Sequence, residues 1–334
     1  MFSFVAGSMA KGRGGGGGGA SGSIDDGWDV PGTVKAAMAF RIIWSVVIFG
    51  LFLTILRRLR SVPPGRYTRA PYILLSIVAG TLSISYLLSA ILFRMSTGES
   101  NAPFPVIRRL GSFNSFLSNV DIAFEPAVSL WLVHLRGRLT NTAEAKSVNP
   151  WVSQHWKRIV DWSLVAITFT IGISTIAISE NAWALYEAHR LDSNQLIDRL
   201  LVNRNLNLTV IALGLFLAID IAISFISLKI SQKRVHFIDP LTTRLLRVVL
   251  PFVVIGFIQS LVITILPNVH TLYETEFNVF NLVITIIDGI CRIGIIGGLL
   301  STMVIPNVLW IPGATTSAVP LPVSGDTGYM SYKS

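Results

Sequence analysis

Residues 112–135 have the length and apolar content of a membrane-spanning helix, yet they carry side chains capable of ionic chemistry. The segment reads SFNSFLSNVDIAFEPAVSLWLVHL and includes two carboxylates, Asp121 and Glu125. Polar residues recur every three or four positions, within an arc of roughly 80° on a helix: Asn114, Ser118, Asp121, Glu125 and Ser129. A charged side chain left in lipid costs about 2.5–3.5 kcal/mol, so we expect this face to point into a helix bundle.

A second polar face lies near the carboxyl end of the chain, in NLVITIIDGICR. Asp288 and Arg292 stand four residues apart, in the order that favours an acid–base pair on one helix. Arginine stays charged inside a protein, so Arg292 needs a buried anion. We predict that it bridges Asp288 and Glu125, with Asp220 at a similar depth of about 18–20 Å. The predicted site residues are Asn114, Ser118, Asp121, Glu125, Asp220, Gln259, Asn281, Thr285, Asp288 and Arg292.

The elements that must position these residues are apolar helices. The 334-residue chain is 51% hydrophobic and 13% charged, whereas soluble domains carry about 25% charged residues. Seven runs reach the roughly 20 residues that a helix needs to cross a bilayer, at 36–56, 71–93, 112–134, 160–179, 206–228, 245–266 and 280–305. The predicted fold is an all-α membrane protein, a bundle of seven transmembrane helices. Its predicted parts are a disordered glycine-rich tail at 1–33, the helical domain at 34–305 and a disordered tail at 306–334.

The distribution of basic residues predicts the orientation. The first, third and fifth loops are rich in Lys and Arg, as in RRLRSVPPGRYTR, whereas the sixth, PNVHTLYETEFN, has two glutamates and no Lys or Arg. The positive-inside rule therefore places the odd loops and the carboxyl terminus in the cytoplasm and the amino terminus outside. The net charge of +9 therefore indicates membrane topology and contact with anionic lipid, and not nucleic-acid binding. We expect a protein of the plasma membrane, or of another endomembrane, with cytoplasmic signalling partners at loops 57–69, 135–159 and 229–244.

Two interpretations of the polar faces stay open. Interhelical polar contacts are common and individually worth only about 0.6 kcal/mol, so the network could serve helix packing alone. Intramembrane ionisable residues are costly, which favours a ligand, ion or proton site. Such a site is expected to open outward, between spans three, five, six and seven. A short interfacial helix in the fourth loop, with Trp183 and Tyr186, is expected to cover it. Gly294 and Gly298 predict close approach of a neighbouring helix.

The sequence contains no recognisable soluble catalytic motif. The five histidines lack metal-ligand spacing, and Gly-x-Ser-x-Gly is absent. Cys291 is the single cysteine and cannot form an intrachain disulfide. We therefore expect no enzyme activity, no metal and no cofactor.

The predicted topology resembles that of the G-protein-coupled receptors, but their motifs are missing. The third span ends HLRGRL instead of Asp-Arg-Tyr, and the seventh ends STMVIPNVLW without Asn-Pro-x-x-Tyr. The seventh span also resembles that of the microbial rhodopsins, whose Asp-x-x-x-Lys matches the register of Asp288 and Arg292. Asp121 and Glu125, followed by Pro126, resemble the counter-ion helix of that family. Arginine cannot form the retinal Schiff base, and the aromatic residues expected in the sixth span are missing, so we assign no family.

Three functions follow from these observations. The first is a receptor-like sensor, with an unknown small ligand in the polar site and basic loops that engage a cytoplasmic partner. The second is a membrane adaptor whose polar core is purely structural, and the third is an ion or proton carrier. Transporters often show internal repeats and paired broken helices, and the sequence shows neither, which disfavours the carrier. The predicted function is the receptor-like sensor.

Overall fold

Helices account for nearly all of the described chain in this computed structural model. The structure describes residues 32–62, 66–97, 103–142, 151–234, 239–269 and 274–304, and these ranges contain no strand. The helices are α2 (Gly32–Ser61), α3 (Arg66–Thr97), α4 (Phe104–Thr142), η1 (Trp151–Ser153), α5 (His155–Glu187), α6 (Ser193–Arg234), α7 (Pro240–Arg244), η2 (Leu245–Val249), α8 (Leu250–Val269) and α9 (Glu274–Met303). The predicted tails at 1–33 and 306–334 lie, apart from two residues, outside the described residues.

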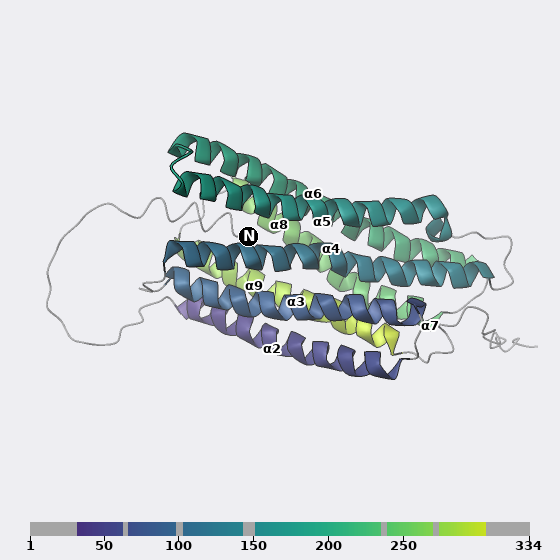
Figure 1. Cartoon of the computed structure of the whole chain (residues 1–334). Helices are drawn as coiled ribbons and strands as arrows, with labels where there is room; N and C mark the ends of the chain where they lie inside the picture. Colours follow the sequence, from purple (N-terminus) through teal and green to yellow (C-terminus); the bar gives the residue numbers. More distant parts are fainter. Residues whose placement is uncertain are drawn as a thin grey trace, which may run out of the picture.

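The described residues contain seven spans that are long and apolar enough to cross a membrane: six single helices, and one span formed by α7, η2 and α8 together. They run side by side with their long axes roughly aligned (Figure 1). The predicted all-α bundle of seven transmembrane helices is confirmed, and the chain is a multi-pass membrane protein. An odd number of spans places the two ends of the helical domain on opposite sides of the bilayer. We call the end predicted to be cytoplasmic the inner end.

Helix α4 lies at the heart of the bundle. Helices that follow one another in sequence pack together, α9 closes the ring against α2 and α8, and α4 additionally contacts α6. In α4, 67% of the most apolar stretch is buried, against 22% in α2, whose exposed side chains suit a lipid-facing helix. Helix α4 is also the least apolar of the seven spans. Its polar residues are tolerated because protein, not lipid, surrounds them.

The ends of α5 and α6 correct one prediction. The fourth loop holds no separate interfacial helix, because α5 continues to Glu187 and α6 begins at Ser193. The short turn between them contains His189, whose φ is 55°. Asp192 and Gln195 then form a capping box: the Asp192 carboxylate accepts from the Gln195 backbone N–H at 2.7 Å, and the Gln195 side chain accepts from Asp192 N–H at 3.3 Å. The cap starts α6 thirteen residues before its apolar run, so both helices extend beyond their predicted ends.

Two glycines of α9 bring a neighbouring helix close, as predicted. A Cβ on Gly294 would lie 2.5 Å from the ring of Phe252, and one on Gly298 would lie 2.9 Å from Val249. Both contacts are too short for real atoms, so α9 packs against the α7–α8 span through these backbone positions.

The α7–α8 span contains one irregular turn. Residues 245–249 form a π-helix, in which the N–H of Leu250 donates to the carbonyl of Leu245 five residues earlier. Pro251 follows directly and has no N–H to donate to the carbonyl four residues before it. The wider turn therefore coincides with the place where a regular helix would lose a hydrogen bond.

Candidate functional site

Arg292 is the centre of a buried ionic site that joins α4 to α9. Its guanidinium binds the Glu125 carboxylate through Nη1, and its Nε lies 3.4 Å from Asp288 Oδ1 on its own helix. The other Asp288 oxygen accepts from the Tyr86 hydroxyl of α3 at 2.5 Å. The predicted bridge from Arg292 to Asp288 and Glu125 is confirmed. Three helices thus meet at one charged centre within their spans.

Asp121 lies one helical turn from Glu125, towards the outer end of α4. It is 3% exposed, and its carboxylate accepts a 2.5 Å hydrogen bond from the Thr81 hydroxyl of α3. We call Asp121, Glu125, Asp288 and Arg292 the central cluster. Three carboxylates and one guanidinium sum to −3 + 1 = −2 if all are ionised. Buried carboxylates in excess of their cations take up protons or bind a further cation.

The central cluster is not sealed. The side chain of Asp288 is 36% accessible and that of Arg292 is 26% accessible, whereas that of Glu125 is 11% accessible. Asp288 is thus the least buried carboxylate of this cluster. The site combines a buried salt bridge with one carboxylate that the bundle only partly covers.

A second arginine continues the polar lining towards the outer end. Arg41 of α2 donates to the Asn281 side chain at 3.0 Å and to the Ser89 carbonyl at 3.3 Å. Its guanidinium also lies 4.8 Å from the centre of the Phe93 ring. Asn281 and Arg292 are eleven residues apart on α9, so the lining extends about 16 Å. Sequence reasoning missed Arg41, although it is the one charged residue within the first predicted span.

Asn114 belongs to this outer group of polar contacts. Among the other predicted residues, Thr285 and Gln259 donate to backbone carbonyls. Asn114 accepts from Ser85 at 3.0 Å and donates to Ser89 at 3.1 Å. The Thr285 hydroxyl donates to a carbonyl of its own helix at 2.7 Å, and Gln259 donates to the Ile284 carbonyl at 3.1 Å. Ser118 is half-buried on α4. Gln259 and Thr285 therefore have a packing role in the structure, and their predicted ligand contacts stay a prediction.

Asp220 lies elsewhere, and its predicted place beside Arg292 is wrong. Both of its carboxylate oxygens accept from the ammonium group of Lys157 at 2.7 Å. Because α6 begins at Ser193 instead of near residue 206, Asp220 stands about 40 Å along that helix, towards the inner end. Its partner lies near the start of α5.

Lys157 and its neighbours form a second buried ionic group, the inner cluster: His134, Lys157, Asp161 and Asp220. Lys157 is 2% exposed and also binds Asp161 one turn along α5. The second Asp161 oxygen lies 3.0 Å from His134 Nε2 of α4, and Nδ1 of this histidine lies 3.2 Å from the Val152 carbonyl. Lys157 falls in the predicted third loop and Asp161 at the very start of the predicted fourth span when hydropathy alone sets the boundary. Their i,i+4 spacing was the available signal that they share one helix face.

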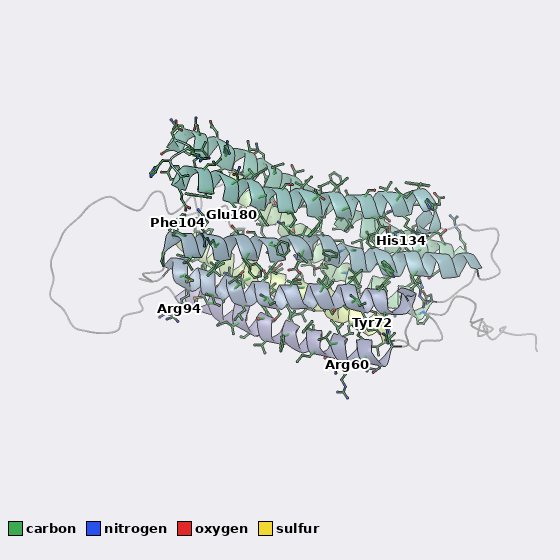
Figure 2. All side chains as sticks on the ribbon, in the orientation of Figure 1. Arg60, Tyr72, Arg94, Phe104, His134 and Glu180 are labelled. Atoms are coloured by element: carbon green, nitrogen blue, oxygen red, sulfur yellow. The ribbon has the colours of Figure 1, made fainter. Side chains whose placement is uncertain are left out.

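A third contact fixes the inner end of α4 to the start of α7. Arg136 donates to Asp239 at 3.1 Å, and both side chains are at most 5% exposed. Asp239 also caps α7, because its carboxylate accepts from the backbone N–H groups of Leu241 and Thr242. The inner end of α4 thus holds η1 and α5 through His134 and α7 through Arg136. Figure 2 shows His134 at the same end of the bundle as Tyr72 and Arg60.

The two clusters lie on opposite faces of α4. Glu125 and His134 are nine residues apart, which corresponds to about 180° of rotation and 13–14 Å of rise. The central cluster therefore faces α3 and α9, and the inner cluster faces α5 and α6. Pro126 lies between them, inside α4, where it removes one backbone hydrogen bond. Helix α4 therefore contributes to both ionic groups, and the backbone between them lacks one helical hydrogen bond.

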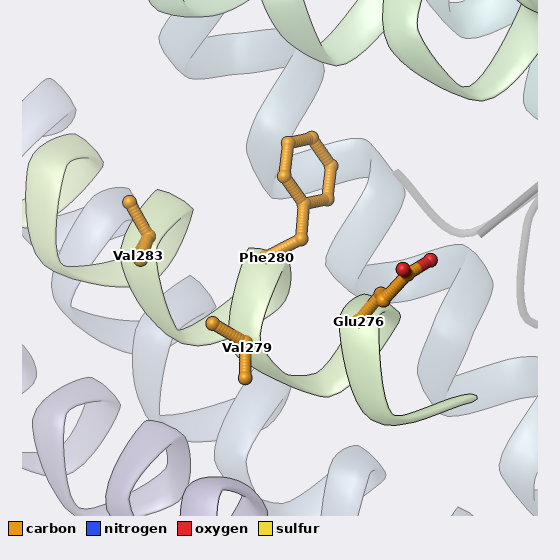
Figure 3. A pocket seen from close by; sticks show the side chains of 4 residues that line it. All are labelled: Glu276, Val279, Phe280 and Val283. Carbon is orange, nitrogen blue, oxygen red and sulfur yellow. The ribbon is translucent and has the colours of Figure 1, made fainter. Parts of the chain in front are cut away.

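A shallow hollow of about 510 Å³ lies at the outer end of α9 and is not the predicted polar site. Figure 3 shows its lining of Val279, Phe280 and Val283, with Glu276 at one edge. None of the predicted site residues lines it. The outward-opening site between spans three, five, six and seven stays a prediction.

Comparison of the chain with protein family models, with curated proteins and with solved structures gave no match. Function must therefore be inferred from the residues of the bundle itself. Among the described residues, no three His, Cys, Asp or Glu side chains gather in a way that could hold a metal ion.

Proposed function

We propose that the protein is a receptor-like membrane sensor. In this proposal the central cluster binds a small cationic ligand, such as an organic amine, that enters from outside. Helix α4 then carries the response to the cytoplasmic loops. No catalytic step is part of this role, and the plasma membrane is the proposed location.

The observation that supports a cationic ligand is the charge imbalance of the central cluster. Arg292 serves both Glu125 and Asp288, and Asp121 has a hydroxyl, not a cation, as its partner. Asp288 retains 36% accessibility, so an amine has a carboxylate to approach. An ammonium group placed there would form a charge-assisted hydrogen bond in surroundings of low dielectric constant.

Support for transmission comes from the inner end of α4. A ligand that draws on Asp121 or Glu125 acts directly on α4, whose His134 and Arg136 hold the third and fifth loops. Packed helices respond to such a pull by small shifts of about 1–2 Å, and not by smooth deformation. We propose that a cytoplasmic signalling protein reads this shift at loops 57–69, 135–159 and 229–244.

The ligand is tested with the purified full chain and a panel of small organic amines, each paired with its neutral alcohol analogue. An amine at one hundred times its Kd should stabilise the protein by about 2.7 kcal/mol and raise its melting temperature. Asp288→Asn should abolish the shift. Asp220→Asn, which makes the same charge change in the inner cluster, should preserve it. An equal shift with the alcohol, or in Asp288→Asn, would reject the cation site.

The partner is tested by pull-down from membrane extracts, with and without an amine that passes the first test. A cytoplasmic protein captured in an amine-dependent manner supports the sensor. Capture of the same protein regardless of ligand indicates an adaptor. Amine-driven ion or proton flux in proteoliposomes indicates a carrier.

A further inference from the structure

A hollow of about 450 Å³ lies on the inner half of α6, against Trp151 of η1. None of the carboxylates of the central or inner cluster lines it. Its apolar wall consists of Ile223, Ile226 and Ile230, whose exposed fractions are 48%, 47% and 49%. Isoleucines exposed on a membrane helix meet acyl chains, so this wall has the character of a lipid contact.

The wall changes chemistry along the helix. Ser227 and Ser231 also line the hollow, and Arg234, the last residue of α6, lines it at the inner end. Ile223 and Arg234 are eleven residues apart, which is about 16 Å along the axis and half of a hydrocarbon core of roughly 30 Å. The hollow thus runs from the depth of acyl chains to the level of head groups.

Two tryptophans give separate support for a position at the level of the lipid head groups. Trp151 lines the hollow, and Trp156 packs against it with ring centres 6.0 Å apart. Trp156 is 52% exposed. Tryptophan side chains concentrate at the membrane–water boundary, where one part of the ring is apolar and its N–H is hydrated. Trp151 in the lining, with Trp156 beside it, agrees with a head group near Arg234.

We infer that this hollow binds one anionic phospholipid, with its phosphate group at Arg234 and the two serine hydroxyls and an acyl chain along the three isoleucines. A soluble anion would leave the isoleucine wall unused, whereas a zwitterionic lipid has no net negative charge to balance the guanidinium. The inner leaflet is rich in anionic lipid, which agrees with the predicted orientation of α6. This site lies apart from the central cluster and goes beyond the proposed sensor function.

Arg234 also suits the negative end of the α6 helix dipole, so a control at the same position is needed. Lys233 supplies it, because it is exposed, carries the same charge in the same turn and does not line the hollow. The full chain in a neutral detergent is titrated with phosphatidylserine and with phosphatidylcholine, and bound lipid is counted by native mass spectrometry. A basic residue at an anionic surface contributes enough for about a fivefold change in affinity.

We expect the wild type to prefer phosphatidylserine, Arg234→Ala to lose about fivefold of that affinity, and Lys233→Ala to change it less than twofold. Ile230→Trp, which fills the wall without touching the charge, should weaken both lipids. Melting temperatures measured in detergent alone identify any variant that is unfolded. If either Arg234→Ala or Ile230→Trp is unfolded, the lipid affinity of the other variant tests the inference. Equal binding of the two lipids, or equal losses in the two charge variants, would overturn the inference. Displacement of phosphatidylserine by millimolar inorganic phosphate would also overturn it, because it would indicate a free-anion site.

Discussion

Removing Arg292 is the most direct perturbation of the central cluster. Arg292→Ala leaves Glu125 and Asp288 without their shared cation inside the bundle. Breaking a buried ion pair by deleting one partner costs about 3–5 kcal/mol. The lower end of that range applies here, because the Asp288 side chain is only partly buried by protein. At about 2 °C per kcal/mol for a chain of this size, the melting temperature should fall by roughly 6 °C.

A double-mutant cycle then isolates the bridge. Glu125→Gln in the Arg292→Ala background removes one stranded anion, so it should recover about 1–2 kcal/mol of the loss. In the wild-type background the same change breaks the bridge and should destabilise the protein. The sign of the Glu125→Gln effect therefore reverses between the two backgrounds.

The chain provides its own reporter for this cycle. Cys291 is the single cysteine and is 2% exposed, so a thiol-reactive fluorophore should label it only when α9 unfolds. Loss of helical circular dichroism serves as a second readout, since Cys291 adjoins the mutated residue. Arg60→Ala is the control, because the Arg60 side chain points away from the bundle (Figure 2). Simple additivity of Arg292→Ala and Glu125→Gln, or a loss no larger than that of Arg60→Ala, would refute the reasoning.

Three further outcomes follow from the same contacts. Gly294→Ala should lower the melting temperature by forcing α8 away, whereas Gly297→Ala, whose added methyl group would meet no atom within 4 Å, should be neutral or stabilising by up to about 1 kcal/mol. Lys157→Ala should cost about 3–5 kcal/mol in thermal or denaturant unfolding, and Asp220→Asn should recover part of it; independent effects would contradict the inner cluster. Reporter tags placed close to the two chain ends should be accessible from opposite sides of the membrane, and access from one side alone would contradict seven spans.

The bundle and its centre were predictable because each depends on a signal that one sequence contains. Seven apolar runs of spanning length specify the helices, and the cost of a charge in lipid specifies which face turns inward. The partner of Arg292 followed from depth along two helices whose outer ends were misplaced by similar amounts, since α4 begins at Phe104 instead of 112 and α9 at Glu274 instead of 280. That calculation needs only the helical rise.

The same calculation failed for Asp220 because hydropathy locates the membrane, not the end of a helix. Helix α6 starts at the capping box of Asp192 and Gln195, in a polar stretch that resembles a loop. Lys157 was placed in a loop for the same reason, since α5 begins at His155, before its apolar run. The sequence did contain local capping signals, the capping box at the start of α6 and Asp239 at the start of α7. Which face of α5 turns inward depends on packing against α4 and α6, and that information is not local.

The π-turn before Pro251 has a consequence for the phase of the whole α7–α8 span. The wide turn takes up one residue more than a regular turn, so the residues after it lie about 100° away from where a regular helix of the same sequence would place them. The rotated half includes Gln259, which reaches the Ile284 carbonyl, and Phe252, which covers Gly294. A regular helix of the same residues, without the wide turn, would have nearly the same length and hydropathy, yet it would turn both side chains away from α9. Deleting a single residue within 245–249 should remove the wide turn and keep both side chains towards α9. Regular helix formation without a deletion would still give a span that crosses the membrane, but that span would present the wrong face to its neighbour.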